Sequence, residues 1–187
     1  MPVSEFFFNP RNVGDARAPS FVGRSGSFRC GATLRISLHI DESQRIVEAK
    51  FKAAGCSALV ASASVLTEQV QGKTTGEAAT LIQQVDLLAE RFDQVEADRA
   101  DCAALAWEAL INAIQEYSDA RRDSWEGEQA LICTCFAVSE KTIEREIQVK
   151  GLTTIAEVTR ACNAGAGCRS CWPLIEDILD DHRAGKW

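Results

Sequence analysis

Hydrophobic and polar residues alternate along residues 27–41, and the apolar positions share one face of this segment. They are Leu34, Ile36, Leu38 and Ile40. This period of two predicts a half-buried strand. A short polar turn follows, and residues 45–51 predict a second strand that returns as an antiparallel hairpin. Residues 14–26 show no comparable period, so we expect a loop there.

Elsewhere before residue 118, apolar residues recur every three or four positions, which is the period of an amphipathic helix. The segments with this pattern are residues 4–9, 59–70, 75–89 and 102–117. The polar run that follows, 118–129, has no period and predicts a linker between domains. We therefore divide the chain into a first domain of residues 1–120, a linker of residues 121–129 and a helical second domain of residues 130–187.

The charge and the apolar content of the chain exclude some classes of function. A formal net charge of -7 argues against nucleic-acid binding, which needs a basic surface. The N-terminal residues do not resemble a signal peptide, and no apolar run approaches the ~20 residues needed to span a bilayer. We therefore expect a cytoplasmic protein outside membranes. Cysteines stay reduced in that compartment, so the eight cysteines predict metal ligands or reactive thiols before disulfides.

Two close pairs of cysteines lie near the C-terminus, Cys133 with Cys135 and Cys168 with Cys171. We expect all four at junctions between loops and helices, where helix N-termini favour the thiolate form. Four soft thiolates suit zinc or an iron–sulfur cluster. Structural zinc sites usually use two C-x-x-C or C-x₂₋₄-C pairs, so the C-x-C spacing of the first pair favours the cluster. Structural zinc remains the alternative.

Three further cysteines, Cys30, Cys56 and Cys102, lie far apart in the first domain. The pattern places Cys30 on the first strand and the other two at helix starts, where the helix dipole favours a thiolate. Three converging thiolates would form an open, labile metal site or a sulfur acceptor. The residues alone leave open that these are three unrelated buried cysteines. We expect Cys162, on an apolar helix face, to be a buried small hydrophobe, and Trp107 and Trp172 to be core residues.

The stretch from about Leu131 to Asp181, with ICTCFAVSEKTIEREI and AGAGCRSC, closely resembles the 2Fe–2S domain of bacterioferritin-associated ferredoxins. The same domain lies in the middle of NifU-type scaffold proteins. The resemblance implies a small all-α fold and one permanent 2Fe–2S cluster. The matching cysteines that it implies as ligands are Cys133, Cys135, Cys168 and Cys171.

Residues from about Glu5 to Tyr117, with FFFNPRNVGDA, SFRCGATLRISL and FKAAGCSALVASASVLTEQVQGKT, resemble the U-type iron–sulfur scaffold domain. The resemblance implies an α+β, IscU-like fold, a small antiparallel sheet with helices on one face, and a homodimer. It also implies a transient 2Fe–2S cluster, or bound iron or zinc, on Cys30, Cys56 and Cys102. In this family a cysteine desulfurase supplies the sulfur, and the finished cluster passes to apo-proteins. The order of the two domains is that of NifU.

The chain departs from the family pattern at two positions beside the cysteines. Ala32 stands where the family has an aspartate associated with cluster release, so we expect slower transfer. Asp101 stands where the family usually has histidine before the third cysteine, and its carboxylate is a candidate fourth ligand. The Pro-Pro stretch read by the specialised Hsp70 chaperone is missing, and we expect no third domain with its own C-x-x-C.

These observations together predict an iron–sulfur cluster assembly scaffold, a carrier and not an enzyme, with a permanent redox-active cluster in its second domain. The NifU-type domain order favours nitrogenase components among the apo-proteins served, and general assembly is the other possibility. Two other functions remain open. One is a ferredoxin-like electron carrier or regulatory protein with a degenerate first domain, which Ala32 and Asp101 favour. The other is a zinc-binding interaction module.

Overall fold

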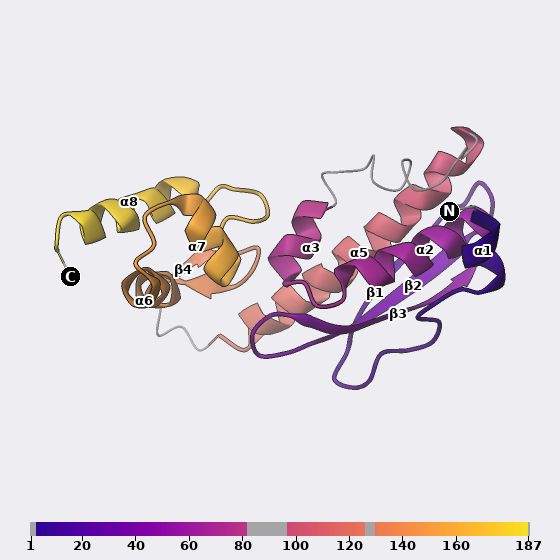
Figure 1. The fold of residues 1–187 in the computed structure, drawn as a ribbon, viewed down its shortest axis with the longest axis horizontal. Coiled ribbons are helices and arrows are strands. Elements are labelled where there is room, and N and C mark those ends of the chain that lie inside the picture. The colour runs from indigo at the N-terminus through magenta and orange to yellow at the C-terminus, as the bar shows by residue number, and fades with distance from the viewer. Residues whose placement is uncertain (1–2, 82–96, 126–129, 187) are drawn as a thin grey trace. The chain divides into compact units, whose positions relative to one another are not determined.

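The structure, a computed structural model, describes residues 3–81, 97–125 and 130–186. The chain divides into two compact units, Met1–Glu116 and Tyr117–Trp187 (Figure 1). The first unit has a sheet with helices, and the second is mainly helical. Among the described residues, no helix combines the length and the apolar character needed to cross a bilayer. The predicted α+β fold class of the first unit is confirmed.

The sheet of the first unit is antiparallel, with its strands in the order β1-β2-β3. The strands are β1 (Phe21–Gly26), β2 (Thr33–Ile40) and β3 (Ile46–Ala54). The predicted hairpin corresponds to β2 and β3, and its alternating residues Leu34, Ile36, Leu38 and Ile40 are buried. The loop predicted for residues 14–26 is wrong over β1. This segment has little apolar alternation, and its pairing along β2 makes it a strand.

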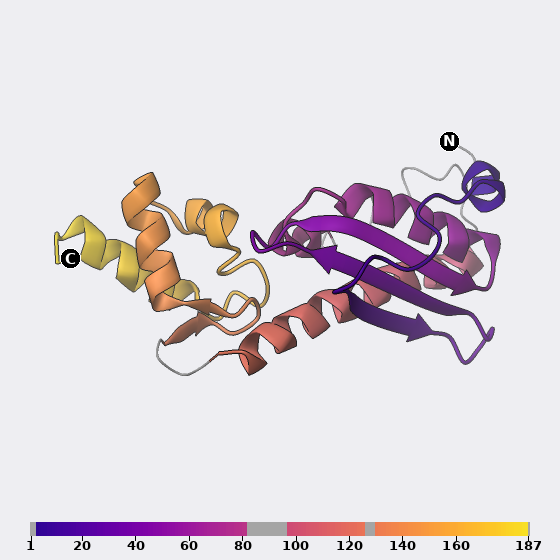
Figure 2. The same ribbon diagram turned by 90° about the horizontal axis from the view of Figure 1, so that it is seen from below.

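The helices that the structure describes beside this sheet are α1 (Val3–Phe8), α2 (Ser57–Val70), α3 (Thr75–Leu81) and α5 (Ala97–Asp123). The helices predicted at residues 4–9 and 59–70 are confirmed. The helix predicted at residues 75–89 is present as α3, and its remaining part lies outside the described residues. Helices α2 and α5 cover one face of the sheet (Figures 1 and 2). Burial of Leu59, Leu66 and Leu110 between these layers forms the core.

The close approach of α5 to the sheet depends on Gly23 in β1. A Cβ atom added at Gly23 would overlap the backbone of α5 at the carbonyl oxygen of Ala109 and the amide of Ala113. The two strand residues after Gly23 also form hydrogen bonds with the helix. The Ser25 hydroxyl donates to the carbonyl of Leu105 at 2.7 Å, and the amide of Asn112 donates to the carbonyl of Arg24 at 2.9 Å. The glycine thus positions α5 against the edge strand.

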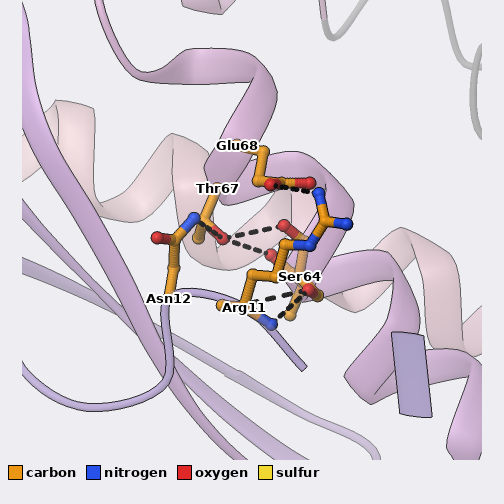
Figure 3. Close-up of polar contacts among 6 residues, drawn as sticks. Arg11, Asn12, Ser64, Thr67 and Glu68 are labelled. Atoms are coloured by element: carbon orange, nitrogen blue, oxygen red, sulfur yellow. Dashed lines mark hydrogen bonds and ion pairs between the residues drawn. The ribbon is translucent and has the colours of Figure 1, made fainter. Parts of the chain in front are cut away.

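A polar network holds the N-terminal segment on α2 (Figure 3). The backbone amide of Arg11 donates to the Ser64 hydroxyl at 2.9 Å, and its guanidinium pairs with Glu68 at 2.8 Å. The side-chain amide of Asn12 donates to the Thr67 hydroxyl at 3.3 Å. The ion pair is exposed and contributes little by itself. The bond to Ser64 is partly buried and fixes the segment that then pairs with the edge of β3.

Helix α5 continues to Asp123, beyond its predicted end near Tyr117, so residues 121–123 of the predicted linker are helical. Two contacts stabilise this last part. Asp119 and Arg122 form an ion pair one turn apart, and the Arg121 guanidinium lies 5.9 Å from the centroid of the Tyr117 ring. Basic residues in the last turn also suit the helix dipole. Residues 126–129 of the predicted linker lie outside the described part.

From residue 130 to residue 186, the described part of the second unit forms a short β-ribbon and helices. The elements are β4 (Leu131–Cys133), β5 (Val138–Ser139), α6 (Glu140–Lys150), α7 (Ile155–Cys162) and α8 (Trp172–Arg183). The capping box that begins α7 uses the side chains of Thr154 and Glu157. Ile143, Ile147 and Ile175 are fully buried between the helices. The ribbon is an addition to the all-α domain predicted from the sequence.

Candidate metal centres

The first cysteine pair of the second unit lies on the β-ribbon. Cys133 is the last residue of β4, and Cys135 lies in the turn that leads to β5. Ala137 closes this turn with a left-handed backbone, at a φ of 49°. The prediction that all four cysteines lie at loop–helix junctions is therefore wrong for this pair. Because the turn between the two short strands is tight, the thiols of Cys133 and Cys135 both point toward the rest of the unit.

The second pair lies between α7 and α8. Cys168 is in the loop, and Cys171 is the N-cap residue of α8. Gly167 permits this loop to pass directly over the first pair. A Cβ atom at Gly167 would lie 3.1 Å from the Cβ atom and 3.4 Å from the Sγ atom of Cys135. Any larger residue there would occupy the space beside the sulfur atoms.

The tertiary structure brings thiols of the two pairs together. The Sγ atoms of Cys135 and Cys168 are 3.2 Å apart, although 33 positions separate them in the sequence. The thiol of Cys171 makes a side-chain contact with that of Cys133. Cys133 and Cys171 are buried, Cys135 is half-buried, and Cys168 is exposed. The four predicted residues thus form one site with a buried side and an open side.

The thiols on the two sides differ in acidity. The Ser170 hydroxyl, 3.0 Å from the Cys168 sulfur, lowers the pKa of Cys168 to about 7 by hydrogen bonding. Burial, with the nearby Cys133 thiol, raises the pKa of Cys171 to about 12. Burial also raises the pKa of Cys135. Of these three thiols, Cys168 most readily forms a thiolate, whereas burial favours the protonated form of Cys135 and Cys171 until a metal binds.

The donors in this site suit an iron–sulfur cluster. All four are cysteine sulfur atoms, the ligand set typical of a 2Fe–2S cluster. They are arranged as two close pairs, and Gly167 leaves space beside them. In the part of the chain that the structure describes, no three His, Cys, Asp or Glu side chains gather around a single metal position. The four sulfur donors fit a 2Fe–2S cluster, with Cys133, Cys135, Cys168 and Cys171 as the residues that would hold it.

Cys162 lies apart from this site. Its side chain is buried on α7, and its thiol donates to the carbonyl of Val158 at 3.3 Å. Burial raises its pKa to about 11, so it stays a neutral thiol at neutral pH. The prediction that Cys162 is a buried small hydrophobe is confirmed.

In the first unit, Cys30 lies in the turn between β1 and β2 and is exposed. The prediction that it lies on a strand is wrong, because β2 begins only at Thr33. Two hydrogen bonds close the turn: the amide of Gly31 donates to the carbonyl of Ser27, and the amide of Ser27 donates to the carbonyl of Ala32. Gly31 has a φ of 69°, which glycine adopts without strain. The turn thus presents Cys30 to solvent.

Cys56 is the N-cap residue of α2, as predicted, and is half-buried. Its neighbour Gly55 packs against the start of β2. A Cβ atom at Gly55 would lie 2.9 Å from the Cβ atom of Ala32. Ala32 itself is only 2 % exposed. This contact places Cys56 and the turn that holds Cys30 at the same end of the sheet.

Asp101 and Cys102 belong to α5, within the helix and not before it, and their side chains lie outside the described part of the structure. One turn further along α5, Leu105 accepts the hydrogen bond from Ser25 near the end of β1. The backbone at Cys102 therefore approaches the same end of the sheet as the Cys30 turn. The convergence of the three cysteines stays a prediction.

A hollow of about 550 Å³ opens beside the Cys30 turn. Its lining includes residues 24–28, residues 31–33 and Glu108 of α5. Phe28 in this lining is fully exposed. Sequence reasoning missed Phe28 and Glu108, because neither lies beside a cysteine nor has a place in a periodic apolar pattern. An aromatic residue within a Ser, Arg and Gly-rich turn was the available signal.

Comparisons with known proteins find matches for both units of the chain. The family profile described as NifU-like N terminal domain matches residues 2–124, and the one described as BFD-like 2Fe–2S binding domain matches residues 131–181. The "Nitrogen fixation protein NifU" of Trichormus azollae is 36% identical over 194 residues, which covers 98% of this chain and 64% of that protein. This chain therefore spans less than two thirds of the length of that relative.

Two further relatives concern the first unit. The "Iron-sulfur cluster assembly enzyme IscU" of Drosophila melanogaster is 36% identical over 119 residues, covering 62% of this chain and 75% of that protein. The crystal structure of the N-terminal part of a nitrogen-fixing NifU-like protein from Brucella abortus shares the fold. It has a TM-score of 0.50 at 20% identity and covers 63% of this chain and 92% of that one. The chain belongs to the NifU family: a NifU-like N-terminal domain is followed by a BFD-like 2Fe–2S binding domain.

Proposed function

We propose that this protein is a scaffold on which iron–sulfur clusters are assembled and from which they pass to apo-proteins. One observation carries the proposal: among the described cysteines of the two groups, only the group in the second unit includes buried thiols. Cys30 and Cys56 lie at one end of the sheet of the first unit, accessible and beside a hollow. The thiols of the second unit converge with Cys133 and Cys171 buried. A site of accessible thiols suits a transient cargo, and a site with two further, buried thiols suits a resident cofactor.

In the first unit, Cys30, Cys56 and Cys102 receive sulfur and iron, with Asp101 as a candidate fourth ligand. A cysteine desulfurase supplies the sulfur as a persulfide. The cargo is a transient 2Fe–2S cluster, and iron or zinc alone are other occupants of the site. The open Cys30 turn supports this role, because thiolates react only where a donor can reach them. The protein carries the cluster in this scheme and is not itself an enzyme.

In the second unit, Cys133, Cys135, Cys168 and Cys171 hold a permanent 2Fe–2S cluster, which when bound supplies or accepts one electron at a time. Release of sulfide from a persulfide takes two electrons: the S–S bond of R–S–SH breaks, and R–S⁻ and HS⁻ form. A cluster held by these cysteines would supply the two electrons one at a time, and an external one-electron donor protein would replace them. Cys168, the most accessible of the four, faces the solvent from which such a donor approaches.

The apo-proteins served are iron–sulfur proteins, with nitrogenase components among them. The relatives named nitrogen fixation proteins support that choice. The compartment that we propose is the cytoplasm. It keeps thiols reduced, which suits the seven described cysteines, among which no disulfide is formed. A homodimer is the oligomeric state that we propose from the family resemblance.

Anaerobic purification, followed by one absorption spectrum with iron, zinc and sulfide counts, tests the proposal. We expect about two irons and two sulfides per chain and the visible bands of a 2Fe–2S cluster. Further cluster should then form on the first unit when desulfurase, cysteine and iron are added, and should move to an apo-ferredoxin. Stoichiometric zinc without colour would instead support the zinc-binding module. Assembly without transfer would support the electron carrier.

Loss of the second cluster should slow assembly on the first unit. Purified chains in which Cys133 and Cys171 are both replaced by serine lack the proposed electron store, so sulfide release from persulfide becomes limiting. The rate of cluster formation, followed by absorption with desulfurase and cysteine, measures this effect. Inorganic sulfide in place of the desulfurase serves as the control, because it needs no reduction. An unchanged rate with desulfurase would reject the electron-supply role.

Replacing Ala32 by aspartate should speed release of the transient cluster. Ala32 lines the hollow beside Cys30 and packs against Gly55. A carboxylate there places a competing oxygen ligand and a negative charge beside the cluster thiolates. We expect several-fold faster transfer to an apo-ferredoxin, at a stability loss of about 1–3 kcal/mol from burying a polar group. Ala32→Asn is the matched control of similar size. Equal transfer rates for both variants would show that charge is not the cause.

A further inference from the structure

Trp172, predicted to be a core residue, lies at the surface of the second unit and is 37 % exposed. It directly follows Cys171 and begins α8. Its indole Nε1–H donates to the carbonyl of Gly165 at 3.1 Å. This bond spans the loop that holds Cys168, because Gly165 precedes that cysteine and Trp172 follows the second one. The side chain therefore joins the two ends of the C-x-x-C loop.

The contact between Trp172 and Gly165 is close enough to need glycine. A Cβ atom at Gly165 would lie 2.6 Å from Nε1 and 2.8 Å from Cδ1 of the indole. Gly165 also has a φ of 82°. On the other side of this loop, the Thr159 hydroxyl of α7 donates to the carbonyl of Ala164 at 2.7 Å. The start of the loop is thus held between α7 and the indole edge.

Arg169 extends the same arrangement between the two cysteines. Its guanidinium carbon lies 5.1 Å from the centroid of the Trp172 ring, within the range of a cation–π contact. Its backbone is left-handed, with a φ of 64°, a conformation that non-glycine residues adopt only when other contacts hold them there. Its carbonyl accepts from the backbone amide of Trp172 at 3.0 Å. The indole therefore stabilises the turn between Cys168 and Cys171.

We propose that Trp172 is a positioning residue for the second-unit cluster, a clasp that closes the loop 165–172 around Cys168 and Cys171. This inference rests on the proposed role of those cysteines as ligands. Residues that orient ligands typically change metal affinity by about 10–100-fold when they are replaced. The closed loop also holds the Ser170 hydroxyl 3.0 Å from the Cys168 sulfur, and hydrogen bonds to sulfur are one factor that tunes reduction potential. Trp172 thus controls both retention and potential.

The experiment compares Trp172→Phe and Trp172→Leu in the full chain, purified anaerobically, with Trp125→Phe as the matched control. Trp125 is also exposed and lies in the same unit. Iron release to a coloured chelator and the midpoint potential are measured. Phenylalanine keeps a ring under Arg169 and loses only the bond to Gly165, whereas leucine loses both. We expect about tenfold faster release for leucine, an intermediate rate for phenylalanine and parental behaviour for the control.

The midpoint potential separates a positioning role from general destabilisation of the fold. Only chains that still hold the cluster contribute to it, so it reports the surroundings of the cluster and not the fraction of unfolded protein. A shifted potential for Trp172→Phe, with an unchanged one for Trp125→Phe, supports the clasp. Parental release and potential in both Trp172 variants would overturn it and leave the proposed function intact. A parent protein without a 2Fe–2S cluster would overturn both. Arg169→Gly removes the guanidinium and also relaxes the left-handed backbone. Faster iron release by this variant would therefore show that the cation–π contact contributes to the clasp.

Discussion

Replacing Cys171 by serine is expected to abolish the 2Fe–2S absorption of the second unit and to lower bound iron by about two atoms per chain. Cys171 is buried, caps α8 and contacts Cys133. Its loss leaves the buried side of the site without a complete ligand pair. The serine oxygen is a harder donor and stays protonated at neutral pH, so it does not replace the thiolate. Iron and sulfide counts after anaerobic purification measure the effect.

The control for this prediction is Cys162→Ala in the same unit. Cys162 is as deeply buried as a ligand, but its thiol bonds to the carbonyl of Val158. We expect this variant to keep its iron and its spectrum, and to lose about 1 kcal/mol of stability from the small cavity. A colourless Cys162→Ala protein, or a coloured Cys171→Ser protein with full iron, would contradict the ligand assignment.

Replacing Gly23 by alanine is expected to disrupt the first unit. The added Cβ atom would overlap the backbone of α5 at Ala109 and Ala113, and backbone atoms cannot rotate away as a side chain can. The helix has to move off β1, which breaks the hydrogen bond between Ser25 and Leu105. We expect a loss of about 3 kcal/mol or more in the free energy of unfolding. Hydrogen exchange of peptides from β1 to β3, followed by mass spectrometry, measures it locally.

Gly26→Ala provides the matched control on the same strand. A Cβ atom there would lie 3.3 Å from the carbonyl oxygen of Ala32 and 3.7 Å from the side chain of Thr33. The neighbours need to move by only a few tenths of an ångström, so exchange in the sheet should change little. Similar protection in both variants would show that α5 adapts to the larger residue and that Gly23 is not required for the packing.

Alternation and helical periodicity predicted the elements whose burial is regular. Leu34, Ile36, Leu38 and Ile40 of β2 are all buried, and α2 buries most of its length, so both were recognisable. Strand β1 was missed because its apolar residues do not alternate regularly. Its FVGRSG sequence carries glycine where α5 approaches and serine where a hydroxyl bonds to that helix. Those requirements come from a helix far along the chain, and no local pattern in β1 reports them.

The candidate sites show the same division between local and distant information. Soft ligands at C-x-C and C-x-x-C spacing indicate a metal centre, because cysteine chemistry depends on residue type. Which thiols face each other does not follow from spacing: Cys135 meets Cys168 because Gly167 lets the loop cross the β-ribbon. The different acidities of Cys168 and Cys171 likewise follow from the hydroxyl of Ser170 and from burial.

The sequence by itself determined the two-part organisation, the hairpin, several helices and the spacing of the C-x-C and C-x-x-C pairs, because these depend on local period and residue type. Only the tertiary structure decided that β1 joins the sheet, that Cys30 lies in an exposed turn and that Trp172 spans the C-x-x-C loop. These features arise where segments distant along the chain meet. The free energy of such contacts depends on how closely two backbones approach each other and on how much surface becomes buried. Neither quantity follows from a residue and its neighbours in the sequence.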